Sequence, residues 1–458
     1  VMCGAVEGLG GGATGYHCTT AAVFISGVVL AILGRFKAGV LGYLVPATVV
    51  HGMLAAIGLI IIAKELPVFF GIASKIKEPL QIYAHVPQMV ANMNPEIALI
   101  GGAAMVILIA FTVLRRWTIV RRVPAPLVVV IAGICFGLMF DLEHAHSYTF
   151  ANHQFLINPK QHLVLLPSNI TDAFALPDWS KAGSFSFWYW TIVIILIQGV
   201  ETLLSCAAVD KLDPYKRPSD LSADLTAVGV GTAISGAIGG LPMITEIVRS
   251  SANVASGART RWSNFAHGMF ILLFVLIGSS VINLIPQAAL AALLMMVGFR
   301  LASPAEFKHV WEIGPDQLFI YCATIIGVLA TDLLVGVGIG ILCKVILEVC
   351  SGAPIGKYMF IARSKCTQEG DRYQVSIEGS ATFSNFLSLK SQIDKIPAGK
   401  QVVLDLSHAT FIDHTAMEHL NRLCREYART GGRMELVGTD HHKARSSHHL
   451  ASRRLANV

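Results

Sequence analysis

The chain has 458 residues, of which 54% are hydrophobic and only 14% are charged, and its mean hydropathy is +0.61. A soluble domain normally carries about 25% charged residues, so a chain made only of soluble domains is excluded. Intrinsic disorder is excluded as well, because it requires low hydrophobicity. The formal net charge is +6 without a basic patch that contains aromatic residues, so we expect no nucleic-acid partner.

The charged residues divide the chain into two parts. Residues 356–458 hold 25 Asp, Glu, Lys and Arg in 103 positions, whereas the first 355 positions hold 39. The first part is therefore about 11% charged and the second about 24%, which is the proportion of a soluble domain. We predict a membrane domain over residues 1–352 and a soluble domain over residues 356–458. The nine cysteines show no metal-ligand spacing, so we expect no cofactor and no metal site.

Apolar runs follow one another through the first part of the chain. A transmembrane helix needs roughly 20 predominantly apolar residues. The candidate runs are residues 18–35, 47–64, 96–114, 123–140, 186–208, 222–239, 264–284, 286–299, 316–331 and 332–349. Residues 68–92 are predicted to form an amphipathic connector, and residues 244–256 a helix too short and too polar to span. The predicted fold is an α-helical polytopic membrane protein with a soluble domain attached.

Basic residues in the loops predict the orientation of these spans. Four arginines lie between two of the spans: Arg115, Arg116, Arg121 and Arg122. The loop over residues 141–185 carries two lysines against four acidic residues. Because basic loops stay on the cytoplasmic side, we predict a multi-pass protein of the cell (inner) membrane with residues 141–185 outside. The soluble C-terminal domain then lies in the cytoplasm.

Glu201 lies within the apolar run over residues 186–208. A carboxylate inside a span is costly and therefore indicates function, commonly a proton or ion pathway. Gln198, Glu201 and Ser205 share one helix face, because they are spaced i, i+3 and i+7. We predict a proton- or cation-coupling site at Glu201 and Ser205. The alternative is a structural carboxylate that bonds a neighbouring helix.

Residues 239–253 combine a Gly-Gly-x-Pro break with a short polar helix. Such a discontinuous membrane helix presents backbone N–H groups and a positive dipole end near the bilayer midplane, where a small anion binds. We predict an anion site at Thr245, Glu246 and Ile247, with Arg249 supplying a full positive charge. Alternatively, Arg249 anchors the helix at the cytoplasmic interface. Glu246 is unusual beside an anion, and it faces a cavity, pairs with Arg249 or lies outside the site.

Together these segments resemble the sulfate permease (SulP) family of inorganic anion transporters. The matching stretches are residues 51–58, 201–212, 239–260, 301–304 and 331–336. The resemblance implies two inverted seven-helix repeats, with core and gate domains, that act as a homodimer by an elevator-like motion. It also implies an anion held between the N-termini of two half-helices. The acidic residue at the position of Glu201 then couples transport to H⁺ or, in some bicarbonate carriers, to Na⁺.

Residues 1–9 resemble the far end of the first half-helix of that family. The resemblance therefore implies that the first two helices and a Gly-Pro-Ala-Ala-type motif precede Val1. On this interpretation the chain is a fragment that lacks half of the expected substrate site.

The soluble part alternates between strand and helix patterns, which indicates an α/β domain. Strands are predicted over residues 372–378, 401–406 and finally 433–437, and a helix begins near residues 411–418. The pattern resembles a STAS domain, the regulatory module usual at the C-terminus of SulP transporters. The resemblance places Asp413 and Thr415 in its regulatory Asp-Ser-Ser/Thr-Gly loop, where the second hydroxyl residue is phosphorylated in related antagonists. The alternative role of this loop is simple helix capping by Asp413.

The last residues are rich in His and Arg, and we predict a solvated basic tail near anionic lipid. The alternative is metal binding by the histidines, which lack an ordered ligand spacing.

The leading functional hypothesis is secondary active transport of a small inorganic anion, sulfate or bicarbonate, by H⁺ symport under control of the STAS domain. The alternatives are a Na⁺-coupled bicarbonate transporter, a nucleobase permease of the same architecture, and a non-transporting scaffold that signals through the STAS domain. A scaffold does not need the costly Glu201 inside the bilayer. The expected partners are the anion, the coupling ion, the lipid bilayer and a second copy of the chain. An enzyme is not expected, because the sequence shows no nucleophile–base–orienter set.

Overall fold

A computed structural model describes residues 1–73, 76, 78–114, 117, 123–150, 153–166, 174–215, 217, 219–255, 257–353, 357–397, 399–429 and 431–456. The four arginines used to predict the orientation, Arg115, Arg116, Arg121 and Arg122, lie outside these described residues. The predicted orientation therefore stays a prediction.

All ten apolar runs predicted as spans contain a helix. The helices are α2 (Gly12–Arg35), α3 (Ala47–Phe69), α6 (Pro95–Val113), α8 (Ala125–Met139), α10 (Phe185–Leu212), α11 (Leu221–Ala237), α13 (Trp262–Ile277), α15 (Gln287–Leu301), α17 (Pro315–Ala330) and α18 (Leu333–Cys350). Within the described part of the chain, five helical stretches are long and apolar enough to cross a membrane: residues 12–35, 47–69, 95–113, 185–206 and 287–313. Helices α8, α13 and α17 are apolar but shorter. The run over residues 264–284 is not one helix, because α13 ends before Gly278 and a short α14 (Ser279–Ile282) follows.

Shorter elements connect these helices. They are α1 (Met2–Gly8), the 3₁₀ helix η1 (Ala38–Leu44), α4 (Pro79–Ala84), α5 (Val86–Ala91), α9 (Pro159–His162), α12 (Ile247–Ala255), α16 (Pro304–Ile313) and α19 (Lys357–Phe360). The predicted connector over residues 68–92 contains α4 and α5, and α12 is the predicted short polar helix. The loop over residues 141–185 contains an antiparallel hairpin, β1 (His146–Phe150) and β2 (His153–Ile157), which the sequence did not predict.

The chain forms two compact units. The first comprises residues 1–53, 174–256 and 304–458, and the second comprises residues 54–173 and 257–303. The first unit holds α10, α11 and α12, where the functional residues were predicted, and also the C-terminal domain.

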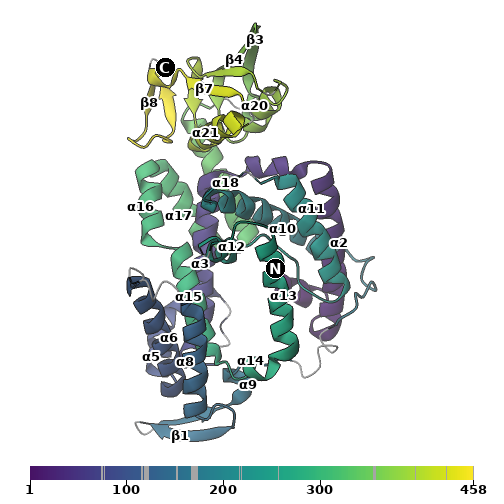
Figure 1. Cartoon of the computed structure of the whole chain (residues 1–458), viewed down its shortest axis with the longest axis vertical. Coiled ribbons are helices and arrows are strands. Elements are labelled where there is room, and N and C mark those ends of the chain that lie inside the picture. The colour runs from purple at the N-terminus through teal and green to yellow at the C-terminus, as the bar shows by residue number, and fades with distance from the viewer. Residues whose placement is uncertain are drawn as a thin grey trace. The chain divides into compact units, whose positions relative to one another are not determined.

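Helices α2 and α11 of the first unit lie side by side along their lengths (Figure 1). Their contact is made by glycines on both sides. A Cβ on Gly27 would approach the Ala233 backbone nitrogen to 2.3 Å, and a Cβ on Gly229 would approach that of Ala31 equally closely, to 2.3 Å. Small residues let membrane helices pack backbone to backbone, where lipid provides no hydrophobic driving force between helices. This pair therefore forms a rigid support for α10, which packs on both helices.

A second glycine-mediated pair, α17 and α18, lies in the same unit. A Cβ on Gly336 would lie 2.3 Å from the Val328 backbone nitrogen, and one on Gly340 would lie 2.2 Å from the Thr324 hydroxyl. The side chain of Thr48, at the start of α3, donates to Gln317 of α17 at 2.6 Å. The close contacts tie the start of α3 to the last two membrane helices.

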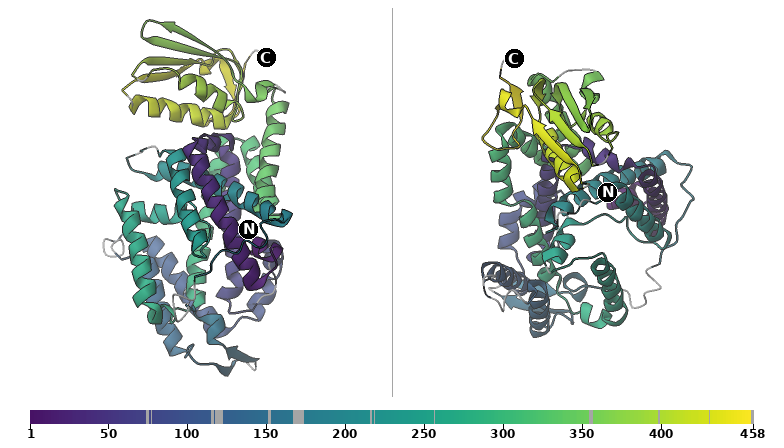
Figure 2. Two further views of the ribbon diagram at one scale, coloured as in Figure 1. Left: turned by 90° about the vertical axis from the view of Figure 1, so that its right-hand side faces the viewer. Right: turned by 45° about the horizontal axis from the view of Figure 1, so that its top comes forward.

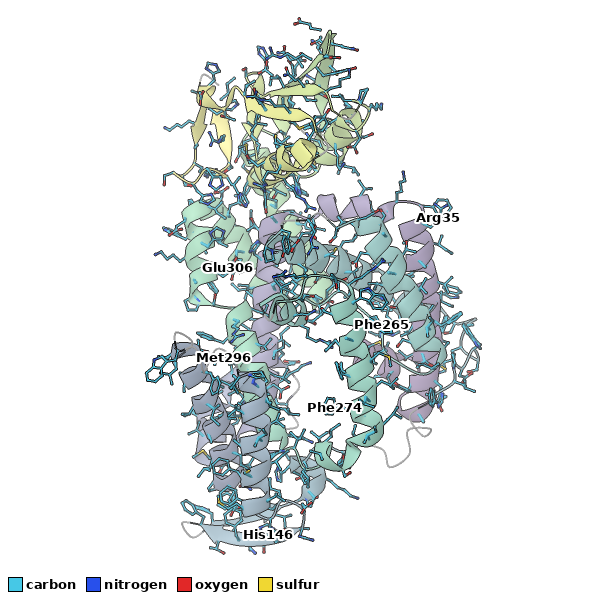
Figure 3. The ribbon with its side chains drawn as sticks, in the orientation of Figure 1. Arg35, His146, Phe265, Phe274, Met296 and Glu306 are labelled. Atoms are coloured by element: carbon cyan, nitrogen blue, oxygen red, sulfur yellow. The ribbon has the colours of Figure 1, made fainter. Side chains whose placement is uncertain are left out.

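The second unit is built around α6, α8 and α15. Its core contains Ile97, Ile100 and Ala104 of α6 together with Ala289 and Ala292 of α15. Helix α13 has no buried residue among its 16 positions, and Figure 3 labels Phe265 and Phe274 on it, which are 61% and 63% exposed. An all-round apolar exposed helix is expected where the surroundings are lipid or another apolar surface.

The C-terminal domain is a mixed sheet with helices. Its elements are β3 (Arg363–Glu369), β4 (Arg372–Ala381), α20 (Phe386–Ile393), β5 (Gln401–Asp405), β6 (Ala409–Ile412), α21 (His414–Arg429), β7 (Arg433–Val437), the 3₁₀ helix η4 (Thr439–His441), β8 (His442–Ala444) and β9 (Arg453–Leu455). The strand order is β7-β5-β4-β6-β9-β8, with β3 antiparallel to β4. Strands β4, β5 and β7 are parallel, and the core lies between the sheet and the two helices (Figure 2). The predicted strands and helix are confirmed.

The predicted tail is an ordered part of the sheet. Its basic side chains Lys443, Arg445 and Arg454 are exposed as predicted, and its position near anionic lipid stays a prediction. Strand β9 pairs antiparallel with β6 and with β8, so the last residues belong to the sheet. His442 is buried and its Nε2 contacts the Ala409 carbonyl at 2.6 Å. Backbone pairing with β6 explains the difference, because it orders strands of three residues that are too short to show a periodic pattern.

Candidate anion and coupling site

The polar face of α10 points into the protein. Gln198 and Ser205 are buried, and so is Thr202, while Glu201 is half-buried between them. Ser184 caps the N-terminus of the helix, because its hydroxyl accepts from the Phe187 amide at 3.2 Å. The predicted i, i+3, i+7 face therefore lines the protein interior instead of lipid, as a functional face requires.

The predicted break between α11 and α12 is confirmed. Helix α11 ends at Ala237, residues 240–246 are without regular structure, and α12 begins at Ile247. Gly239 has a φ of +93°, a left-handed conformation that glycine adopts at little cost. A Cβ at this position would also approach the Ala175 backbone nitrogen to 2.5 Å. The sharp end of α11 thus depends on this glycine.

Two side chains hold the extended segment beside α10. The amide nitrogen of Gln198 donates to the Met243 carbonyl at 2.7 Å and to the Thr232 hydroxyl on α11. The Met243 backbone N–H in turn donates to the Thr232 hydroxyl at 3.1 Å. Gln198 and Thr232 therefore satisfy the backbone of the break and fix where α12 starts.

The start of α12 carries the predicted anion residues. Thr245 and Glu246 directly precede the helix, and Ile247 is its first residue. The Thr245 hydroxyl donates to Asp224 of α11 at 2.8 Å. Arg249 lies in the first turn with its side chain exposed. The structure thus brings Thr245 and Ile247 to the helix start and points Arg249 towards the surface.

Carboxylates gather around this helix start. Glu201 of α10 and Glu246 interact electrostatically as like charges, and Asp224 reaches the same segment through Thr245. Sequence reasoning missed Asp224, although the rule that selected Glu201 applies to it, since it lies in the predicted span over residues 222–239. Like charges brought together favour the binding of a proton or another cation between them.

Two buried side-chain oxygens close to Glu201 in the sequence of α10 accept no hydrogen bond from the described residues. Within the described part of the chain, Gln198 Oε1 and Thr202 Oγ1 have no hydrogen-bond partner. Buried polar atoms are nearly always satisfied, so each such exception calls for an explanation such as a water or an ion. The two residues lie one turn apart on α10, Gln198 three positions before Glu201 and Thr202 directly after it. No group of three His, Cys, Asp or Glu side chains suited to a resident metal occurs among the described residues.

The predicted regulatory residues lie at the start of α21. Asp413 accepts from the Ala416 amide and, at 3.1 Å, from the Phe383 amide. Thr415 is completely buried. Burial disfavours the charged form of Asp413, but Lys344 and these amides hold the pKa of this carboxyl below its usual value. Asp413 therefore caps α21 as an ionised group.

A helical membrane bundle with a broken helix at a polar site, joined to an α/β domain of this topology, defines a class of membrane transporters with an attached STAS-type module. Comparison with known families identifies the family of each of the two parts. The sulfate permease family matches residues 5–324, and the STAS domain family matches residues 365–449. The chain belongs to the sulfate permease family and carries a C-terminal STAS domain.

Its relatives are transporters, not enzymes. The chain is 23% identical over 428 residues to the putative sulfate transporter YvdB of Bacillus subtilis. The matched region covers 91% of this chain and 76% of the relative. It is 26% identical over 338 residues to the bicarbonate transporter BicA of Picosynechococcus, covering 71% of this chain and 54% of that protein.

Solved structures support the fold. A structure of SLC26A9 matches with a TM-score of 0.58 at 12% identity, over 93% of this chain and 70% of the other. The transmembrane domain of a cyanobacterial BicA matches with a TM-score of 0.56 at 21% identity, over 71% of this chain and 77% of the other. The predicted family and fold class are confirmed.

Proposed function

We propose that the chain transports a small inorganic anion, sulfate or bicarbonate, by secondary active symport with a cation. The start of α12 at Thr245–Ile247 supplies the backbone N–H groups and the positive dipole end for the anion. Glu201 and Ser205 on α10 serve the cation, and Glu246 stands between the two. Relatives named as sulfate and bicarbonate transporters support both anions as candidates.

One observation carries this proposal. Gln198, three residues before Glu201 on α10, donates directly to the Met243 carbonyl in the segment that leads to α12. The cation residue and the anion residues are therefore mechanically linked through a single side chain. In this proposal, a change in the charge at Glu201 acts on the start of α12 through Gln198 and the short segment that leads from Met243 to Ile247. In this proposal Arg249, which is exposed, raises the local concentration of the anion and does not clamp it.

We propose H⁺ as the coupling ion, because one carboxylate is sufficient to carry it. The second candidate is Na⁺, and a specific observation favours it: Gln198 Oε1 and Thr202 Oγ1 are buried oxygens without a partner in the described residues, on either side of Glu201. Neutral and anionic oxygens are the ligands that hard cations take.

The remaining features of the proposal follow the family. The protein works as a homodimer by an elevator-like motion in the cell (inner) membrane, with a membrane domain over residues 1–352 and a cytoplasmic, regulatory STAS domain over residues 356–458. The regulatory role of Asp413 and Thr415 belongs to this proposal.

The test is uptake by the complete gene product in liposomes. Labelled sulfate and bicarbonate are compared with a dicarboxylate and chloride under an inward H⁺ gradient and, separately, an inward Na⁺ gradient. We expect Glu201→Gln to abolish gradient-driven uptake while anion exchange persists, because a neutral amide no longer carries a proton. Ser186→Ala, at the start of the same helix, is the matched control. Unchanged gradient-driven uptake in Glu201→Gln would refute the coupling role, and uptake of none of the anions would refute the proposed function.

A further inference from the structure

Three ionisable side chains are buried where α18 meets the STAS domain. The Lys344 ammonium of α18 lies 3.3 Å from Glu348 Oε1 on the same helix and 3.2 Å from Asp413 Oδ2 at the start of α21. Lys344 is 2% exposed, Glu348 3% and Asp413 0%. Buried charges are tolerated only while they are paired, so separating the two elements would leave charges without compensation. This cluster is therefore a strong anchor between α18 and α21.

Further contacts strengthen the anchor. The buried Thr415 hydroxyl accepts from the Ala47 amide, at the start of α3, at 3.3 Å. The Ser446 hydroxyl donates to the Ile313 carbonyl at 2.7 Å, and Ser452 donates to Asp316 at 3.2 Å. These groups belong to the start of α3, to α16 and to α17; α17 packs against both α16 and α18, and Thr48 at the start of α3 donates to α17. The STAS domain is thus fastened to this group of helices at several points.

A weaker contact joins the same STAS helix to α10. Arg422, two turns along α21, places Nη2 3.4 Å from Asp210 Oδ2 near the end of α10. The two side chains are 19% and 12% exposed, so water reaches them. Asp210 also accepts from the Ser219 amide at 3.0 Å, which fixes it at the turn between α10 and α11. On this side the STAS domain otherwise packs α20 against η1.

We propose that α21 is a clamp that fastens α10, the helix of the cation residue Glu201, to α18. The clamp is anchored at Lys344 and released at Asp210. In this proposal the difference in burial sets which contact opens, since breaking a partly exposed ion pair costs less than leaving buried charges without a partner. This inference rests on the proposed transport function: if α10 moves relative to α18 during the cycle, the docked clamp restrains that motion, and release of Arg422 from Asp210 precedes it.

A charge-exchange series in the complete protein tests the clamp. The variants are Asp210→Arg, Arg422→Asp and the double exchange, with Arg425→Asp as the matched control because it is an exposed arginine on the same helix. Hydrogen exchange of residues 206–212 and 417–428 reports docking, and initial uptake rates in liposomes report transport. We expect each single variant to increase the hydrogen-exchange rate and the initial uptake rate by about two- to fivefold, the range for loss of a partly exposed ion pair. The double exchange should restore both rates.

The possible results distinguish a failure of the clamp from a failure of the proposed function. Exchange that is unchanged in the single variants, or not restored in the double variant, would overturn the clamp. Faster exchange with unaltered uptake would overturn its role as a restraint. If the unaltered protein transports none of the tested anions, the proposed function fails, and the hydrogen exchange alone decides whether α21 fastens α10 to α18.

Discussion

Replacing Lys344 by methionine tests the energetics of the buried cluster most directly. Methionine keeps most of the volume of lysine, so the substitution removes the charge with little change in packing. It leaves Asp413 and Glu348, which are 0% and 3% exposed, without the ammonium that lies 3.2 and 3.3 Å from them. Breaking a buried ion pair by removing one partner typically costs about 3–5 kcal/mol.

This free-energy cost weakens the docking of the STAS domain onto α18. The backbone amides of Ala416 and Phe383 still donate to Asp413, so the start of α21 keeps part of its stabilisation. If the free energy of docking becomes less favourable by about 3 kcal/mol, the ratio of docked to undocked protein falls by a factor of about 100. We expect the region around residues 382–385 and 413–416 to exchange hydrogen accordingly faster in the detergent-solubilised protein.

The matched control is the triple variant Lys344→Met, Glu348→Gln, Asp413→Asn. Since replacing a whole buried charge cluster by neutral groups of similar size is often neutral or stabilising, we expect docking to recover most of the loss. A loss below about 1 kcal/mol in Lys344→Met alone would refute the reasoning, because that is the value of a solvated pair. No recovery in the triple variant would show that packing around α18, not charge, holds the domain.

The remaining predictions concern the site, the helix packing and pH. Gln198→Leu should weaken anion binding in liposomes about tenfold or more, because it removes the side-chain amide that donates to the Met243 carbonyl and to the Thr232 hydroxyl; an unchanged affinity would remove the proposed link to α12. Gly229→Leu should prevent folding, seen as loss of a monodisperse peak in size-exclusion chromatography, because the Ala31 backbone lies 2.3 Å from the new Cβ; Gly338→Leu, with nothing within 4 Å, is the control. Asp413 has a lowered pKa in the folded protein, so its stabilising effect is fully present above its ordinary value of about 4 and is lost as the pH falls below it; hydrogen exchange of α21 across acidic pH should show this loss, and Asp413→Asn should remove the dependence.

The membrane helices could be predicted from sequence because each is encoded by its own run of apolar residues. The same holds for the break before α12, since the Gly-Gly-x-Pro signal and the polar helix lie next to each other in the chain. Strands β8 and β9 could not be predicted, because three residues have no measurable period and their order comes from pairing with β6. Local signals thus predict local structure, and partners far apart in the chain escape them.

Lys344 illustrates the limit at the level of function. A lysine and a glutamate four residues apart in the predicted span over residues 332–349 are visible in the sequence, and the cost of charge in a span indicates a role for them. Their partner Asp413 lies more than sixty positions further on, in a different domain. Only the folded chain shows that the cluster joins the membrane helices to the STAS domain.

The charges around α12 make coupling a physical requirement for the proposed transport. An anion at the start of this helix meets the positive dipole end, but also Glu246, Glu201 and, through Thr245, Asp224. An exposed Arg249 offsets these charges poorly, because water screens it. In the proposed transport, a proton or Na⁺ bound at Glu201 removes one of these repulsions and so raises the affinity for the anion. Because such coupling is reciprocal, the anion must raise the affinity for the cation by the same factor. Neither ion then binds well alone, and a symporter needs that property to avoid leaking one ion without the other.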